Sequence, residues 1–214
     1  MFGFALLSGC DPGEDEFRTG NPPYEVWLVD QSNSFGKTFG GQIYIYDGED
    51  LSGNHAEDAE PDDVIPLDCN AAELCRATTT ADPVRPHMLV FNQENTHGIL
   101  SFVASGHVVI FDAPTRRPLS CFRTEAGAGG ARQAHAAFPT AGDDNIVVAN
   151  QNGKLLERIS TDYDTDTFTQ NAAATINLST CVTPSGAACQ AAGVRPDNAP
   201  ICPVPLPNGQ VVVT

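Results

Sequence analysis

Two histidines, His87 and His135, stand 48 residues apart, and each opens a similar stretch of sequence. Both are expected at the start of a strand that recurs along the chain. Imidazole is a common metal ligand and carries a positive charge when protonated. Two histidines at equivalent places therefore suggest a metal site or an anion site, with hydrogen bonding inside each repeat as the alternative. His97 and His107 begin the next two predicted strands and are weaker candidates.

Three aspartates at alternate positions, Asp162, Asp164 and Asp166, have a spacing typical of calcium loops. An EF-hand loop also needs Gly at its sixth position and Glu at its twelfth. The sequence has Thr167 and Ala173 there. A solvated hairpin turn is therefore favoured over a calcium site.

Motifs of nucleophilic or nucleotide chemistry are missing from the sequence. It contains no G-x-S-x-G, no H-E-x-x-H, no phosphate-binding P-loop and no G-x-G-x-x-G. The glycines of residues 125–133 lie between predicted strands with no helix to follow, so they are expected to form a flexible loop rather than a dinucleotide cradle. No catalytic residue is assigned from the sequence.

The apolar segment of residues 2–9 ends at Cys10, which follows Leu7, Ser8 and Gly9. This pattern resembles the lipobox of bacterial lipoproteins, in which the cysteine is lipidated and becomes the first residue of the mature protein. The resemblance implies a membrane anchor at Cys10 and a location in the bacterial cell envelope, facing the periplasm or the exterior. Residues 1–9 lack Lys and Arg and are shorter than the roughly 15–30 residues of a signal peptide, so they are expected to be a truncated signal. A buried cysteine in a first strand is the alternative.

Six cysteines remain if Cys10 is lipidated: Cys69, Cys75, Cys121, Cys181, Cys189 and Cys202. An even number in an exported domain favours disulfides, although many pairings are open. Cys69 with Cys75 and Cys181 with Cys189 lie within short loop-like stretches, so these local pairs are expected, and Cys121 with Cys202 is the remainder. Zinc is the alternative, but neither spacing is usual for a zinc site.

The composition describes an acidic chain with room for one sizeable domain. Its 214 residues carry 27 acidic and 11 basic side chains, a net charge of −16. Nucleic-acid binding needs clustered Lys and Arg, so nucleic acid is excluded as a partner. Apart from the N-terminal run, no apolar stretch approaches the roughly 18–20 residues of a membrane span. The expected partners are a membrane, through the lipid anchor, and a protein or small-molecule ligand.

Short runs rich in Val, Ile, Phe and Tyr dominate the chain from residue 24 onward, with Gly, Asn, Asp and Pro between them. Such runs are typical of strands separated by turns. No helical pattern exceeds about two turns. The sequence therefore predicts an all-β fold.

The runs also repeat. Residues 85–124 and 132–178 each supply four strands in the same order, and residues 195–214 begin the cycle again. A four-strand unit that recurs every 40–50 residues or so is the signature of β-propeller blades. Segments 26–31, 99–104 and 146–151 are then equivalent second strands, and 87–93, 134–140 and 199–205 are innermost strands. A β-sandwich is the alternative.

Two segments, "HVVIFDAPTRRPLSCF" at 107–122 and "NIVVANQNGKLLERI" at 145–159, resemble the YVTN-type propeller repeats of bacterial envelope proteins. A propeller closes with about four to eight blades. The expected fold is thus a partial β-propeller of about three four-stranded antiparallel blades, belonging to a longer propeller. Residues 1–9 are the truncated signal, 10–23 an acidic tether and 24–214 the propeller, with loop insertions at 48–86 and 180–199.

The main functional hypothesis is a cell-envelope lipoprotein whose propeller binds a ligand or acts as a scaffold. The alternative is a propeller enzyme, similar to lactonases, quinoprotein dehydrogenases or metal-dependent thiol oxidases, with its site at the central channel. A channel metal ion held by His87 and His135 belongs to that alternative.

Overall fold

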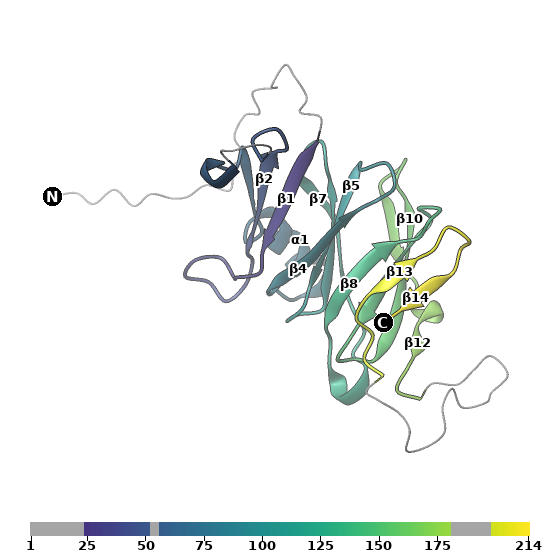
Figure 1. The fold of residues 1–214 in the computed structure, drawn as a ribbon. Coiled ribbons are helices and arrows are strands. Elements are labelled where there is room, and N and C mark those ends of the chain that lie inside the picture. The colour runs from purple at the N-terminus through teal and green to yellow at the C-terminus, as the bar shows by residue number, and fades with distance from the viewer. Residues whose placement is uncertain (1–23, 52–55, 181–197) are drawn as a thin grey trace.

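The computed structural model describes residues 24–51, 56–180 and 198–214, and strands are the main regular structure of these residues (Figure 1). The strands are β1 (Glu25–Asp30), β2 (Gln42–Asp47), β3 (Asp63–Pro66), β4 (Pro86–Phe91), β5 (His97–Phe102), β6 (His107–Asp112), β7 (Arg117–Arg123), β8 (Ala134–Pro139), β9 (Asn145–Asn150), β10 (Leu155–Asp162), β11 (Thr167–Gln170), β12 (Ile176–Asn177), β13 (Pro203–Pro205) and β14 (Val211–Val213). The helix α1 spans Asn70–Thr79, and short 3-10 turns occupy Ala56–Asp58, Ala128–Gly130 and Ala172–Ala174.

The strands form antiparallel sheets that we call blades. Blade 1 has the order β1-β2-β3, blade 2 the order β4-β5-β6-β7, and blade 3 the order β8-β9-β10-β11 with β12 beside β10. The pair β13-β14 begins a further unit. The predicted four-strand units in residues 85–124 and 132–178 are confirmed, and the fold is a partial β-propeller.

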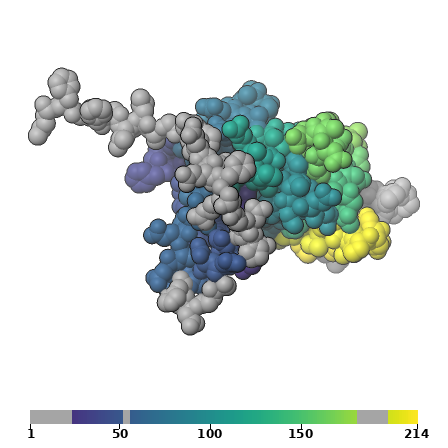
Figure 2. Space-filling view, turned by 90° about the horizontal axis from the view of Figure 1, so that it is seen from above, coloured from purple at the N-terminus to yellow at the C-terminus, as the bar shows by residue number. Residues whose placement is uncertain are grey.

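The blades follow one another in chain order (Figures 1 and 2). Strand β4 lies against β8, and β8 lies against β13, so these three are the innermost strands that we expected. Strand β1 contacts β4 as β5 contacts β8, which gives β1 the place of a second strand, again as expected.

Apolar side chains fill the space between neighbouring blades. Strand β5 is buried along its whole length. Leu100 and Phe102 join the core between blades 1 and 2, whereas Ile99 joins the core between blades 2 and 3. Successive side chains of a strand point to opposite faces of its sheet, so a sheet covered on both faces reads as a continuous apolar run rather than an alternating one.

Backbone contacts repeat with the 48-residue period predicted for His87 and His135. The amide of Val103 donates to the carbonyl of Arg85 at 3.0 Å, and that of Gln151 donates to Gln133 at 2.9 Å. The turns between first and second strands also match, since Asn95 and Asp143 both have a positive φ, of 58° and 55°. Equal positions in sequence are therefore equal positions in the blades.

The insertion expected at 48–86 is more ordered than a loop. It contains β3, which pairs with β2 to extend blade 1, and helix α1, whose ten residues exceed the two turns that we expected as an upper limit. Ala, Leu, Glu and Arg favour helix in this segment. Ala71, Ala72 and Cys75 form its buried face, and the helix packs mainly against β7.

The expected pairing of Cys69 with Cys75 is wrong, because Cys75 forms a disulfide with Cys121, 46 residues away. Cys69 is also disulfide-bonded, and Cys202 is free, so the expected pair of Cys121 with Cys202 is wrong too. Six residues of helix rise about 9 Å and make well over one turn, which separates Cys69 from Cys75. Helix α1 instead turns Cys75 toward β7.

Several predictions lie outside the described residues. These are the signal at 1–9, the tether at 10–23 with Cys10, and the pair Cys181–Cys189 in the insertion at 180–199. Within the described ranges, no helix is long and apolar enough to cross a membrane.

Candidate functional site at the inner rim

His87 and His135, which the repeat puts at equivalent positions, lie together at the starts of the innermost strands, the end of the blades that we call the rim. His87 is near the start of β4 and His135 near the start of β8, and their ring centroids are 4.6 Å apart with an interplanar angle of 75°. Each lies at an irregularity in the pairing of first and second strands, between Pro86 and Leu89 in blade 2 and between Ala134 and Ala136 in blade 3. Such bulges redirect a side chain away from the regular pleat and are frequent next to active sites.

Blade 1 contributes Gln31 to this rim. The side-chain amide nitrogen of Gln31 lies 2.8 Å from Nδ1 of His87. An amide nitrogen only donates hydrogen bonds, so Nδ1 of His87 accepts and the ring is neutral. Burial lowers the pKa of His87 below its usual value, and the nearby His135 and Arg85 lower it further. The site therefore favours a neutral imidazole at neutral pH.

An open pocket of about 320 Å³ is lined by Gln31, Ser32, Asn33 and Arg85, and of these Gln31 contacts His87. The backbone amide of Arg85 donates to the Asn33 side-chain oxygen at 3.2 Å. Arg85 has a φ of 58°, a left-handed conformation that is uncommon for residues other than Gly, Asn and Asp and often marks a functional site. The exposed side chain of Arg85 brings a positive charge to this pocket on an otherwise strongly acidic chain.

Two polar atoms at the blade 3 side of the rim are buried without a hydrogen-bond partner among the described residues. They are Nδ1 of His135 and the side-chain oxygen Oε1 of Gln133. Buried polar atoms are nearly always paired in proteins, so each exception calls for an explanation. Both belong to residues at or just before the start of β8, and the His135 ring contacts that of His87. We call the set Gln31, Arg85, His87, Gln133 and His135 the inner rim.

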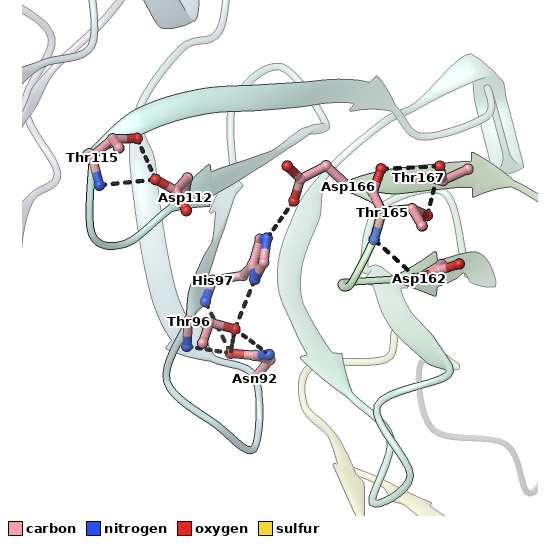
Figure 3. Close-up of polar contacts among 9 residues, drawn as sticks. All are labelled: Asn92, Thr96, His97, Asp112, Thr115, Asp162, Thr165, Asp166 and Thr167. Carbon is pink, nitrogen blue, oxygen red and sulfur yellow. Dashed lines mark hydrogen bonds and ion pairs between the residues drawn. The ribbon is translucent and has the colours of Figure 1, made fainter.

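A second polar cluster joins blades 2 and 3 at the other end of these strands (Figure 3). Nε2 of His97 lies 2.9 Å from a carboxylate oxygen of Asp166, and Nδ1 lies 2.9 Å from Oγ1 of Thr96. An Asp–His–Thr chain has the residue types of a nucleophilic relay. However, Thr96 Oγ1 is engaged with the side chain of Asn92, so this cluster acts as a clasp between blades.

The aspartates with the spacing of a calcium loop form the turn between β10 and β11. The Asp162 carboxylate accepts the Thr165 amide at 3.2 Å. Asp112 holds Thr115 in the same manner in the turn between β6 and β7 (Figure 3). The prediction of a hairpin turn is confirmed.

Glu157 is a buried carboxylate that sequence reasoning missed. It is only 2% exposed, yet it accepts hydrogen bonds from the Glu125 amide and from the side chains of Asn150 and Gln170. Burial raises its pKa above the usual value, although these hydrogen bonds oppose the shift. With its oxygens satisfied inside the protein, Glu157 fixes the connection between blades 2 and 3.

The four candidate histidines thus separate into three places. His87 and His135 meet at the inner rim, His97 belongs to the clasp, and His107 is buried beside α1. Sequence reasoning missed Gln31, Arg85 and Gln133. The only signal for the last two was their shared offset of two residues before the paired histidines.

Comparison with solved structures supports the propeller fold. The chain resembles a periplasmic gluconolactonase from Pseudomonas aeruginosa, with a TM-score of 0.51 and 15% identity over 76% of this chain and 42% of that one. It also resembles a proposed 6-phosphogluconolactonase from Bacteroides fragilis, with a TM-score of 0.53 and 12% identity over 92% of this chain and 49% of that one.

The chain spans less than half the length of these two proteins. No protein-family model matches the sequence, and no curated protein matches it. At such low identity the likeness concerns the fold alone. The described residues therefore have a partial β-propeller architecture, and the chemistry has to be argued from the inner rim.

Proposed function

We propose that this protein is a propeller binding domain whose inner rim holds a small polar ligand, with an anionic group facing Arg85. The observation that carries the proposal is the meeting of His87 and His135 from two blades, with Nδ1 of His135 and Oε1 of Gln133 left unpaired beside them. A ligand hydroxyl donates to such acceptors, and a carboxylate or phosphate pairs with a guanidinium. Ligand sites typically combine a few convergent polar groups of this kind.

Binding is tested by calorimetry with sugar acids, sugar phosphates and neutral sugars, using the wild type and three variants. We expect Arg85→Gln to weaken binding of anionic ligands tenfold or more, and His135→Ala to weaken all ligands. Arg117→Gln is the matched control, because Arg117 is exposed on β7, at the opposite edge of blade 2 from β4. Equal affinities in Arg85→Gln and Arg117→Gln would contradict the proposed role of Arg85.

The cell-envelope assignment is part of the same proposal. The support for it is the lipobox resemblance at Leu7–Cys10 and the resemblance of 107–122 and 145–159 to YVTN-type repeats. Lipidation of Cys10 would anchor the propeller and place the inner rim in the periplasm or outside the cell.

Lactone hydrolysis is the second candidate, favoured by the likeness to a gluconolactonase fold and by the neutral His87. For His87 to accept a proton from the attacking water, the Gln31 side chain must first release Nδ1, because its hydrogen bond occupies the one lone pair of the neutral ring. Arg85 would pair with the carboxylate product. Acid release from an aldonolactone tests this. His87→Gln should abolish release above the uncatalysed rate, whereas retained activity would remove His87 from the reaction.

A metal ion at the rim is a weaker proposal. His87 and His135 supply two imidazole ligands, whereas metal sites in proteins usually take three or four protein ligands. If a metal ion mediates ligand binding at the inner rim, a chelator should abolish that binding. Calorimetry with and without a chelator therefore distinguishes a metal-dependent from a metal-independent inner rim.

A further inference from the structure

A different set of residues groups three metal-binding atoms. Cys75 on α1, Cys121 on β7 and His107 at the start of β6 each offer one ligand atom, and these atoms all lie within 4.8 Å of one another. All three residues are buried, with His107 and Cys75 at 0% exposure and Cys121 at 4%. Within the described part of the chain, this is the one group of three or more such residues.

In the structure the two sulfurs are joined as a disulfide, and a disulfide sulfur is not a thiolate ligand. A dithiol reductant cleaves this bond by thiol–disulfide exchange. Two electrons and two protons pass to Cys75 and Cys121, which become thiols, and the reductant becomes a disulfide. Metal binding then releases the two thiol protons.

We propose that the reduced chain binds Zn²⁺ through the thiolates of Cys75 and Cys121 and the imidazole of His107. Sulfur and imidazole nitrogen are the usual ligands of structural zinc, at about 2.3 Å and 2.0–2.1 Å. Tetrahedral angles place two such sulfurs about 3.8 Å apart, so the sulfurs need only small movements from the present cluster. Two thiolates also balance the charge of a divalent ion, which limits the cost of burying it.

The surroundings of His107 suit a ligand. The Thr79 hydroxyl donates to the Cys75 carbonyl at 2.7 Å and lies 2.8 Å from Nε2 of His107. Because its hydrogen is donated to the Cys75 carbonyl, the Thr79 hydroxyl oxygen accepts a hydrogen bond from Nε2–H of His107. The lone pair is then on Nδ1, where it faces the Ser105 hydroxyl at 2.8 Å. Zinc on Nδ1 would take the place of the Ser105 hydroxyl, which would move aside by rotation of the Ser105 side chain. The N–H on Nε2 would stay hydrogen-bonded to Thr79, the usual arrangement of a metal-binding histidine.

Bound zinc would hold helix α1 against blade 2, as the disulfide does. Helix α1 is tied to blade 2 by the disulfide, by Thr79 through His107 and by the Thr78 hydroxyl, which donates to the Cys121 carbonyl at 3.1 Å. A Zn²⁺ ion bridging Cys75 and Cys121 keeps the helix attached when the covalent bond is lost. The attachment of α1 then holds under oxidising and reducing conditions alike.

The test uses Co²⁺ as a coloured substitute for Zn²⁺ in the full chain. Protein is reduced with a dithiol, freed of it without oxygen, and titrated with Co²⁺. We expect one equivalent with the absorbance of tetrahedral thiolate-bound cobalt, displaced by Zn²⁺. The equivalent is absent in the oxidised protein and in Cys75→Ser/Cys121→Ser, which keeps the other five cysteines and so measures their background. His107→Gln should bind at least tenfold more weakly.

A second measurement is thermal unfolding of the reduced protein, which Zn²⁺ should stabilise because it binds the folded state. Equal cobalt absorbance in the wild type and the double serine variant would overturn the proposal, and so would unchanged affinity in His107→Gln. If the double variant fails to fold by circular dichroism, His107→Gln decides, because it retains the disulfide during folding. His97→Gln, which changes a histidine outside both the zinc cluster and the inner rim, is the matched histidine control and should bind Co²⁺ like the wild type.

Discussion

His97 and Asp166 are joined across the boundary of blades 2 and 3, at 2.9 Å. The same two positions one boundary earlier are occupied by Glu25 and Arg116, joined at 3.1 Å. His97 and Glu25 both begin second strands, and Arg116 and Asp166 both lie in the last turn of their blades with a positive φ, of 57° and 51°. The clasp is thus repeated with its carboxylate and its nitrogen donor exchanged between the two blades.

This exchange predicts that the contact can be rebuilt with an acidic residue at position 97 and an arginine at position 166. Asp166→Arg alone should lower the free energy of unfolding, because the introduced guanidinium would face the His97 ring without an acidic partner. Adding His97→Glu should recover about 0.5–1 kcal/mol, the range of partly exposed ion pairs. Urea unfolding of the two variants and the wild type measures this, and additive effects of the two substitutions would show that the positions are not coupled.

The buried His107 predicts a loss of stability in acid. Burial first, and then the positive charge of Arg123, lowers its pKa from 6.5 to about 4. The unfolded chain therefore binds a proton that the folded chain excludes, so stability is complete above about pH 6.5 and declines as pH falls toward 4. The loss is on the order of 3 kcal/mol.

Unfolding of the disulfide-intact protein by urea between pH 7.5 and 4 tests this effect. His107→Gln lacks the ionisable ring and should show a flatter profile than the wild type, although it is less stable overall. Parallel profiles would show that another group causes the acid sensitivity.

The disulfide between Cys75 and Cys121 predicts a defined peptide map. Non-reducing digestion should yield these two cysteines in one linked peptide. A loop of 46 residues gives about 4 kcal/mol in the chain-entropy model, so Cys121→Ser should lower the unfolding free energy by a few kcal/mol. The pair Cys181–Cys189 stays a prediction for the same map. Six free thiols would contradict export to an oxidising compartment.

Cys10 predicts lipid labelling. In a bacterial host that supplies a complete signal peptide, the wild type should incorporate a palmitate analogue and Cys10→Ser should not, because the thiol is the acceptor. Cys202→Ser is the matched cysteine control and should label like the wild type. Equal labelling of the wild type and Cys10→Ser would contradict the lipobox interpretation.

The blades could be predicted because each needs apolar residues on both faces, which gives runs rich in apolar residues such as β5 and β6. The 48-residue period then placed His87 beside His135. Helix α1 was missed because its apolar face is short, consisting of Ala71, Ala72 and Cys75. This face is buried by packing against β7, a contact that the local sequence pattern does not show. The same contact decided the pairing of Cys75.

The rest of the inner rim depends on geometry that no local pattern encodes. Gln31 contacts His87 although it belongs to blade 1 and stands 56 residues earlier in the chain. The left-handed backbone at Arg85 is held by a hydrogen bond to the Asn33 side chain. Neither residue type is unusual for a loop. Their place in the site depends on how the blades pack against one another, which the local sequence does not show.

The two-sided burial of β5 has a consequence for exchanging repeats between proteins. Adjacent residues Ile99 and Leu100 face different neighbours, so each blade carries two independent sets of contacts on one short strand. The equivalents of Gly98, Leu100 and Phe102 in blade 3 are Ile146, Val148 and Asn150. A blade copied into the next position would bring the wrong shape to the side that faces the preceding blade. Although the units share a period and the same turns, they are not interchangeable modules, and a chimaera must transfer a blade together with the facing surfaces of its neighbours.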